Sequence, residues 1–238
     1  MRDYFDEEVA RSYDEEHLDA GDLDQAVDFL ADLAGGGRVL EFAIGTGRVA
    51  LPLLKKGLEV AGIELSQPMV DQLRAKPSGD TIPVIIGDMA SATLDGHFSL
   101  VFLVFNTICN LDTQDQQIAC FKNAADHLHA GGHFVIETFV PPIQCLPLGE
   151  SLLAFAAGSD HWGTDEIDIA SQSMTSHHIW VRSEEIVRRS IPFRYVWPSE
   201  LDLMAKLAGM ELVGRWEDWE KKPFTSVSKR HVSVWRKI

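Results

Sequence analysis

One stretch, "RVLEFAIGTGRVA" at residues 38–50, constrains the fold of this chain more than any other. Its apolar run predicts a buried strand, Gly45 and Gly47 predict a tight turn, and the residues after them predict the start of a helix. Further strands are predicted at 58–65, 82–89, 98–105 and 133–140, with helical patterns between them. This alternation is typical of an α/β fold with a doubly wound parallel sheet and right-handed crossovers.

The rhythm changes after residue 140. Segments 167–182 and 184–197 mix polar and apolar residues without a helix between them, and we predict that they form antiparallel strands. A helix at 198–208 and strands at 210–219 and 231–238 are predicted to complete the chain. The segment 141–197 is therefore expected to be a β-rich cap, or insertion, over the carboxyl edge of the sheet.

Charge and composition narrow the class of protein. The formal net charge is −15 over 238 residues, and a field of that sign repels nucleic acid. The three cysteines lack C-x-x-C spacing, so we expect reduced thiols and no metal site. The longest purely apolar stretch, 100–105, is too short to span a bilayer, and we expect a cytoplasmic protein without a membrane partner.

Three carboxylates follow the predicted strands. Glu41 lies inside the first strand, where a buried charge needs a partner such as an ammonium group, whereas a dinucleotide pyrophosphate would be repelled. Glu64 ends the second strand, roughly twenty residues beyond the first glycine, where a carboxylate can accept both hydroxyls of a ribose. Asp88 ends the third strand and can accept an adenine amino hydrogen, while Met89 packs on the base. The three side chains are expected to bind one ligand along the carboxyl edge.

Taken together, "VLEFAIGTG", "GIELS", "GDM" and "HAGGHFVIE" resemble the class I S-adenosylmethionine-dependent methyltransferases over roughly residues 35 to 140. The resemblance implies a Rossmann-like sheet of mostly parallel strands whose C-terminal strand is antiparallel. It also implies a cofactor site. The residues involved are Glu41, Ala43, Gly45 and Gly47 for the methionine part, Glu64 and Leu65 for the ribose, Asp88 and Met89 for the adenine, and Phe105 beside the methyl group.

Two departures from the family pattern concern the expected site, besides Ala-Gly-Gly in place of the frequent Pro-Gly-Gly before the fifth strand. Ala43 replaces the first glycine of the loop, and no Asn-Pro-Pro-Tyr follows the fourth strand. The second departure disfavours methylation of DNA or of protein glutamine. The expected activity is transfer of a methyl group from S-adenosyl-L-methionine to oxygen or nitrogen of a small-molecule acceptor, with S-adenosyl-L-homocysteine as product.

Three residues are candidates for a catalytic role. Asn106 could orient the acceptor, Tyr13 lies in a segment that resembles the part of related enzymes that closes over the cofactor, and His178 in the cap could accept a proton. Each also has a structural reading: a turn asparagine, a packed tyrosine and an exposed histidine. Tyr4 and His17 share the N-terminal segment with weaker support.

Two other functions stay open at this point. Because Gly45, Gly47 and Ala50 match G-x-G-x-x-A, an NAD-dependent oxidoreductase is one, although the chain lacks a Tyr-x-x-x-Lys pair and Glu41 disfavours a pyrophosphate. A non-catalytic S-adenosylmethionine-binding protein is the other. A homodimer is also left open. The expected organisation is one domain, 1–238, with an N-terminal helical lid at 1–34, a cofactor-binding core at 35–140, a cap at 141–197 and a sheet-completing segment at 198–238.

Overall fold

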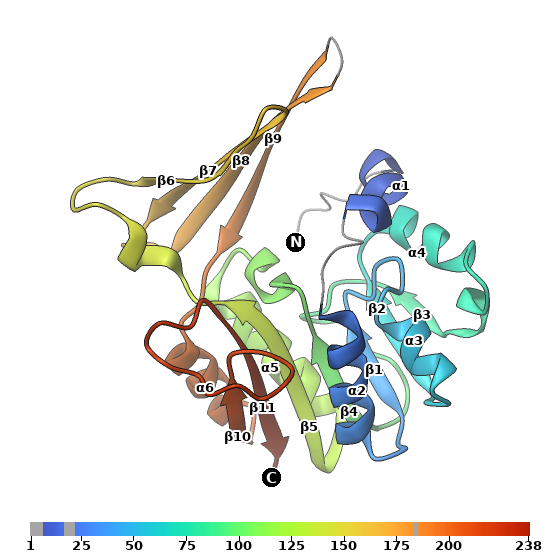
Figure 1. Ribbon diagram of the computed structural model, residues 1–238. Coiled ribbons are helices and arrows are strands. Elements are labelled where there is room, and N and C mark those ends of the chain that lie inside the picture. Colours follow the sequence, from blue (N-terminus) through green and yellow to red (C-terminus); the bar gives the residue numbers. More distant parts are fainter. Residues whose placement is uncertain (1–6, 17–21, 183–184) are drawn as a thin grey trace.

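The computed structural model describes residues 7–16, 22–182 and 185–238. Its central sheet comprises β1 (Val39–Phe42), β2 (Val60–Glu64), β3 (Val84–Ile86), β4 (Phe98–Leu103), β5 (Leu128–Phe139), β10 (Met210–Trp216) and β11 (Arg230–Lys237). The strand order is β10-β11-β5-β4-β1-β2-β3, and β1 to β5 pair in parallel with one another (Figure 1). The C-terminal strand, β11, runs antiparallel to β5. A mostly parallel sheet with an antiparallel C-terminal strand is the Rossmann-like architecture that was expected, and it is confirmed.

Helices cover both faces of this sheet. On one face lie α2 (Leu23–Ala34), α3 (Ala50–Lys55) and α4 (Gln67–Arg74), and on the other lie α5 (Gln114–His127) and α6 (Pro198–Leu207). Strand β4 is apolar at odd and even positions because both of its faces are buried. Leu100 and Phe102 face the core under α2, α3 and α4, whereas Val101 and Leu103 face the core under α5 and α6. Three short 3₁₀ helices, η1 (Gly79–Thr81), η2 (Thr107–Asn110) and η3 (Pro142–Cys145), lie in the connections.

The segment after residue 140 forms a second, four-stranded antiparallel sheet. Its strands are β6 (Leu152–Ala157), β7 (His161–Asp168), β8 (Ser173–Arg182) and β9 (Glu185–Arg194), in that order, and Figure 1 shows them rising away from the central sheet. The prediction of one continuous strand over 167–182 is wrong. The chain turns between β7 and β8, where Ala170 N donates to Asp168 Oδ1 at 2.9 Å and Gln172 has φ 57°.

Two other predicted boundaries are also wrong. The strand predicted to end at 197 ends at Arg194, whose guanidinium donates to Glu200 Oε1 at 2.7 Å and also to Gln117, and so ties the end of β9 to α5 and α6. The predicted turn before 133–140 is instead a bulge inside β5. Phe98 pairs with Leu128 and Leu100 pairs with His133, so extra residues of β5 are accommodated between two successive pairs.

The strand order creates a crevice at the carboxyl ends of β1 and β4. From β1 the chain adds β2 and β3 on one side, and then returns to place β4 on the other side of β1. Open α/β sheets bind ligands at such a point of reversal. Within the described residues, no helix has the length and apolarity needed to cross a membrane, and no group of three or more His, Cys, Asp or Glu side chains could hold a metal ion.

Candidate active site

The glycine loop after β1 holds an unusual backbone conformation. Gly45 and Gly47 have φ of 56° and 78°, and a Cβ on Gly47 would lie 2.4 Å from Leu73 Cδ1. Both the left-handed backbone and this close packing favour glycine at position 47. Ala43 also has a positive φ of 53°, which costs an L-residue about 1–2 kcal/mol. The loop therefore bends as the glycine pattern predicts, with some strain at its non-glycine start.

Glu64 fixes this loop to β2. Its Oε2 accepts from Gly45 N at 2.8 Å, and its Oε1 accepts from Ser66 N at 2.9 Å. The side chain is buried, and Leu65 beside it is half-buried. A carboxylate has about four lone-pair sites, and these two backbone bonds use one site on each oxygen of Glu64.

Glu41 is a buried carboxylate with an orphaned oxygen. The side chain is 3% exposed, and Oε2 has no hydrogen-bond partner among the described residues. Burial raises the pKa of Glu41 well above its usual value, with a further contribution from Glu64, while Arg48 and the backbone N–H of Ala50 act in the opposite direction. A ligand that brings an ammonium group would satisfy this oxygen and favour the charged form.

Helix α1 (Glu7–Glu16) brings Tyr13 to the same place. Burial raises the pKa of Tyr13 to about 12, and Arg48, Glu64 and Glu41 all lie near enough to influence it. A phenol with this pKa stays protonated at neutral pH, so it can donate a hydrogen bond but does not serve as a base. Arg48, which the sequence analysis did not single out, places its guanidinium 4.8 Å from the centre of the Phe105 ring.

Three residues join α1 to the glycine loop and form what we call the α1 latch: Asp14, Thr46 and Lys76. Thr46 Oγ1 donates to Asp14 Oδ1 at 2.6 Å, Lys76 Nζ forms an ion pair with Asp14 Oδ2, and the same ammonium donates to Thr46 O at 2.7 Å. Burial would raise the pKa of Asp14, but the hydrogen bonds from Lys76 and Thr46 outweigh it and lower the pKa. The latch holds the Tyr13-bearing helix against the loop.

Replacing Lys76 by methionine is expected to accelerate release of S-adenosylhomocysteine about fivefold, because a partly exposed ion pair contributes about 1 kcal/mol. Stopped-flow displacement of the bound compound measures this rate. The matched control is Lys56→Met, since Lys56 forms a 2.7 Å ion pair with Asp28 on α2, away from the loop. Equal release rates in all three proteins would contradict a role for the latch.

Asp88 and Met89 follow β3. Asp88 is half-buried, and its Oδ1 accepts from Ala90 N at 2.8 Å. Met89 is 2% exposed and packs into the core beneath α5, where Asn123 Nδ2 donates to its carbonyl oxygen at 2.8 Å. The structure thus fixes the Met89 backbone at the carboxyl edge and places its side chain in the core.

Phe105 and Asn106, beyond β4, adopt left-handed φ angles of 60° and 63° in succession. Such residues cost on the order of 1–3 kcal/mol each and are concentrated at functional sites. Asn106 Oδ1 accepts from Phe139 N at 2.8 Å, and Asn106 N donates to Glu137 O at 3.2 Å. The turn is therefore held by hydrogen bonds from both the side chain and the backbone of Asn106.

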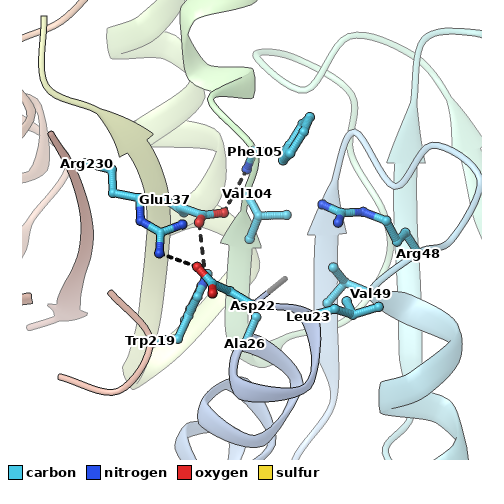
Figure 2. Close-up of a pocket in the computed structure, with 10 residues that line it drawn as sticks. All are labelled: Asp22, Leu23, Ala26, Arg48, Val49, Val104, Phe105, Glu137, Trp219 and Arg230. Carbon is cyan, nitrogen blue, oxygen red and sulfur yellow. Dashed lines mark hydrogen bonds and ion pairs between the residues drawn. The ribbon is translucent and has the colours of Figure 1, made fainter. Parts of the chain in front are cut away.

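Two adjoining cavities lie beside this turn. The first, the Arg48 cavity, has a volume of about 240 Å³ and is drawn in Figure 2. Its lining residues are Asp22, Leu23, Ala26, Arg48, Val49, Val104, Phe105, Glu137, Trp219 and Arg230. The second, the Asn106 cavity, has a volume of about 520 Å³ and is lined by Phe105, Asn106, Glu137, Phe139, Glu217, Val227, Lys229 and Arg230. The two cavities share Phe105, Glu137 and Arg230.

None of the described residues of the second sheet lines these two cavities. Their walls come from the start of α2, from Arg48 and Val49 before α3, from the ends of β4 and β5, and from the segment 217–230 before and at the start of β11. No ligand contact is predicted from the sequence for Glu137, Trp219 or Arg230. The sequence signal for Glu137 was a charged residue in the otherwise uncharged run "FVIETFV". A role for 141–197 in enclosing an acceptor stays a prediction.

His178 lies in an aromatic cluster on the second sheet. Its Nδ1 is 3.0 Å from His161 Nε2, and its ring stacks on that of Trp180 at 4.9 Å between centroids. Burial, His161 and Arg189 lower its pKa. The structure brings Tyr13, Glu41 and Glu64 together but does not bring His178 into the lining of either cavity. Tyr4 and His17 lie outside the described residues.

Known proteins resemble this chain over most of its length. A family model described as "Methyltransferase domain" matches residues 39–132. The solved structure of the CcbJ methyltransferase from Streptomyces caelestis is 38% identical, covers 96% of this chain and 96% of its own, and has a TM-score of 0.86.

Two curated relatives are named for methylation of nitrogen. The cypemycin N-terminal methyltransferase of a Streptomyces species is 25% identical over 84% of this chain and 82% of that protein. A dTDP-3-amino-3,4,6-trideoxy-alpha-D-glucopyranose N,N-dimethyltransferase of Streptomyces venezuelae is 32% identical over 42% of this chain and 41% of its own length.

Likeness at 38% identity over nearly the whole of both chains sets aside the oxidoreductase and the non-catalytic binding protein. The structure agrees with this result. At the point where the strand order reverses, β1 is followed by a glycine loop and contains the buried carboxylate of Glu41, one oxygen of which has no partner among the described residues. The chain belongs to the class I S-adenosylmethionine-dependent methyltransferases, and S-adenosylmethionine is its methyl donor.

Proposed function

We propose that this enzyme methylates an oxygen or nitrogen atom of a small-molecule acceptor bound beside Phe105 and Asn106. The observation that supports this most strongly is the pair of adjoining cavities, of about 240 and 520 Å³, at the ends of β4 and β5. Cavities of this order suit small organic ligands. The names of the two curated relatives favour nitrogen over oxygen as the acceptor atom.

The cofactor would lie across the glycine loop with its ends fixed by carboxylates. The orphaned Glu41 oxygen fits the ammonium of the methionine part, Glu64 fits the ribose hydroxyls and Asp88 fits the adenine amino group. Ala43, Gly45 and Gly47 bend the loop so that its backbone can approach the ligand closely. Tyr13 on α1 would close over this arrangement and donate a hydrogen bond.

S-adenosylmethionine supplies a methyl group activated by the positive charge on its sulfur, so that an acceptor lone pair forms the new bond while the carbon–sulfur electrons stay on sulfur. The chain has to hold the acceptor in line and exclude water, and such positioning contributes about 7–11 kcal/mol. The strained turn at Phe105 and Asn106, fixed through Phe139 and Glu137, provides a rigid edge for this purpose. No proton acceptor is required when the attacking atom is an uncharged amine.

A turnover screen tests the proposal. The enzyme and S-adenosylmethionine are incubated with nucleotide-linked amino sugars, free amino acids, short peptides, phenols and alcohols, and S-adenosylhomocysteine release is followed by mass spectrometry. We expect release with at least one small molecule and methylation of that molecule. Methylation confined to folded proteins or nucleic acids would contradict a small-molecule acceptor.

A further inference from the structure

One carboxylate is common to both cavities and to the turn after β4. Glu137 lies near the carboxyl end of β5, half-buried, and lines the Arg48 cavity and the Asn106 cavity alike. Asp22 lines only the first of them, and Glu217 only the second. Glu137 is therefore the acidic group at the place where the two cavities adjoin.

Two neutral donors fix the orientation of this carboxylate. Trp219 Nε1 donates to Glu137 Oε1 at 3.2 Å, and Phe105 N donates to Oε2 at 3.2 Å, as the dashed lines in Figure 2 show. Trp219 is itself 4% exposed and packs against Phe29 of α2 with ring centroids 5.4 Å apart, so the indole donor is held in place. Because a carboxylate can accept about four hydrogen bonds, each oxygen keeps capacity for a ligand.

The two arginines that line these cavities interact with other groups, and a third cation, Lys229, lines the Asn106 cavity. Arg230, which also lines both cavities, forms an ion pair with Asp22, and Arg48 lies over the Phe105 ring. Among the described residues, no lysine, arginine or histidine forms an ion pair with Glu137. A half-buried negative charge that is oriented but not neutralised favours a cationic ligand.

We propose that Glu137 is the acceptor-binding carboxylate and that the acceptor is a primary or secondary amine that binds as its ammonium ion. This inference rests on the proposed function and specifies its substrate class. The ammonium gives one proton to solvent, its lone pair forms the bond to the methyl carbon as the carbon–sulfur bond breaks, and the product is again an ammonium ion. A carboxylate beside the nitrogen stabilises the positive charge that moves there from sulfur. An alcohol acceptor would gain much less from this interaction.

Binding of a matched pair of probes tests the proposal without knowledge of the natural acceptor. Cyclohexylamine, which is cationic at pH 7.5, and cyclohexanol have nearly the same shape. Their dissociation constants are measured by NMR titration of protein saturated with S-adenosylhomocysteine. We expect the amine to bind about tenfold more tightly than the alcohol, as a charge-assisted hydrogen bond predicts, and Glu137→Gln to abolish this preference. Equal binding of the two probes, binding of neither, or a preference that survives in Glu137→Gln would overturn the proposal.

The control variant is Glu211→Gln, which removes the same charge from an exposed side chain that pairs with Arg236 on the outer strands. It should keep the tenfold preference. If Glu137→Gln fails to fold, crystals of the wild-type complex with S-adenosylhomocysteine are soaked in cyclohexylamine. Its nitrogen within hydrogen-bond distance of the Glu137 carboxylate supports the proposal, and any other position overturns it.

The outcome is separable from the proposed function. Methyl transfer to phenols or alcohols without any amine preference would leave a small-molecule methyltransferase and refute the role of Glu137. Tight amine binding that depends on Glu137, together with methylation confined to macromolecules, would instead refute the small-molecule acceptor while retaining the amine-binding site.

Discussion

Replacing Glu64 by alanine is expected to lower the affinity for S-adenosylhomocysteine about 100-fold. If the buried carboxylate accepts the ribose hydroxyls, as we propose, its loss removes hydrogen bonds to a charged group that contribute about 1.5–3 kcal/mol each. Two such bonds account for about 3 kcal/mol at the lower bound, which corresponds to about two orders of magnitude. Isothermal titration calorimetry measures the change, and unchanged affinity would refute the ribose assignment.

The same substitution should also loosen the glycine loop. Gly45 N and Ser66 N lose their acceptor, so we expect a loss of about 2 kcal/mol of stability, or several degrees in melting temperature. Glu64→Gln keeps one acceptor oxygen and should show a smaller effect on both quantities. The matched control is Glu59→Ala, immediately before the same strand, where the carboxylate accepts from Arg38 Nε at 2.6 Å on the surface. That variant should bind the ligand as the wild type does.

Replacing Glu41 by glutamine is expected to stabilise the ligand-free enzyme while it weakens cofactor binding about tenfold. Burial is the main reason that the pKa of Glu41 is raised. A carboxyl group with a raised folded-state pKa contributes stability below its unfolded pKa of about 4.3, and that contribution is lost as pH rises through the folded value. The stability of the wild type is therefore lowered at neutral and higher pH by the cost of ionising buried Glu41, and the glutamine variant does not have this cost.

Thermal melts from pH 5 to pH 8 test this expectation. The melting temperature of Glu41→Gln should exceed that of the wild type by an amount that grows with pH. Calorimetry in buffers of different ionisation enthalpy provides a second readout: because the ammonium of the ligand favours ionised Glu41, ligand binding to the wild type should release protons that the variant does not release. A variant that is less stable throughout, or that binds equally well with the same proton release, would contradict the assignment.

Much of the central fold was predictable because local pattern and burial agree there. The run 98–105 is apolar on both parities, and the structure places alternate residues of β4 in cores on opposite faces. The glycine pattern predicted the turn after β1, where a positive φ and close packing against Leu73 both favour glycine at position 47. The strand–helix rhythm then restricted the connections to a doubly wound sheet.

The second sheet was predicted less well, and the reason is physical. Its strands bury few side chains, and its core around Ile167, Met174 and Tyr195 is small. Few positions in these strands therefore show from their hydrophobicity which way they face. The turn at 169–172 depends on a local bond from Ala170 to Asp168 instead of a glycine or proline. Alternation alone therefore suggested one continuous strand.

For the site, the acidic residues of the parallel strands were identifiable because strand ends and charge both appear in the primary sequence. Glu41 and Glu64 lie on neighbouring strands that pair in register, Glu41 opposite Gly62, which is two residues before Glu64. Glu137 was not identifiable in this way. Its place in the candidate site follows only from the tertiary structure, in which β5 pairs with β4 and Trp219, from the segment before β11, donates to its carboxylate.

The sequence by itself determined the order of strands and helices over residues 35–140, the bend after β1 and the class of cofactor, because each could be predicted from short motifs in the chain. Only the tertiary structure decided which charges meet. Trp219 reaches Glu137 across 82 positions, and Asp14 reaches Thr46 across 32. Contacts over such separations arise from packing of whole elements, and no periodicity or local motif records them.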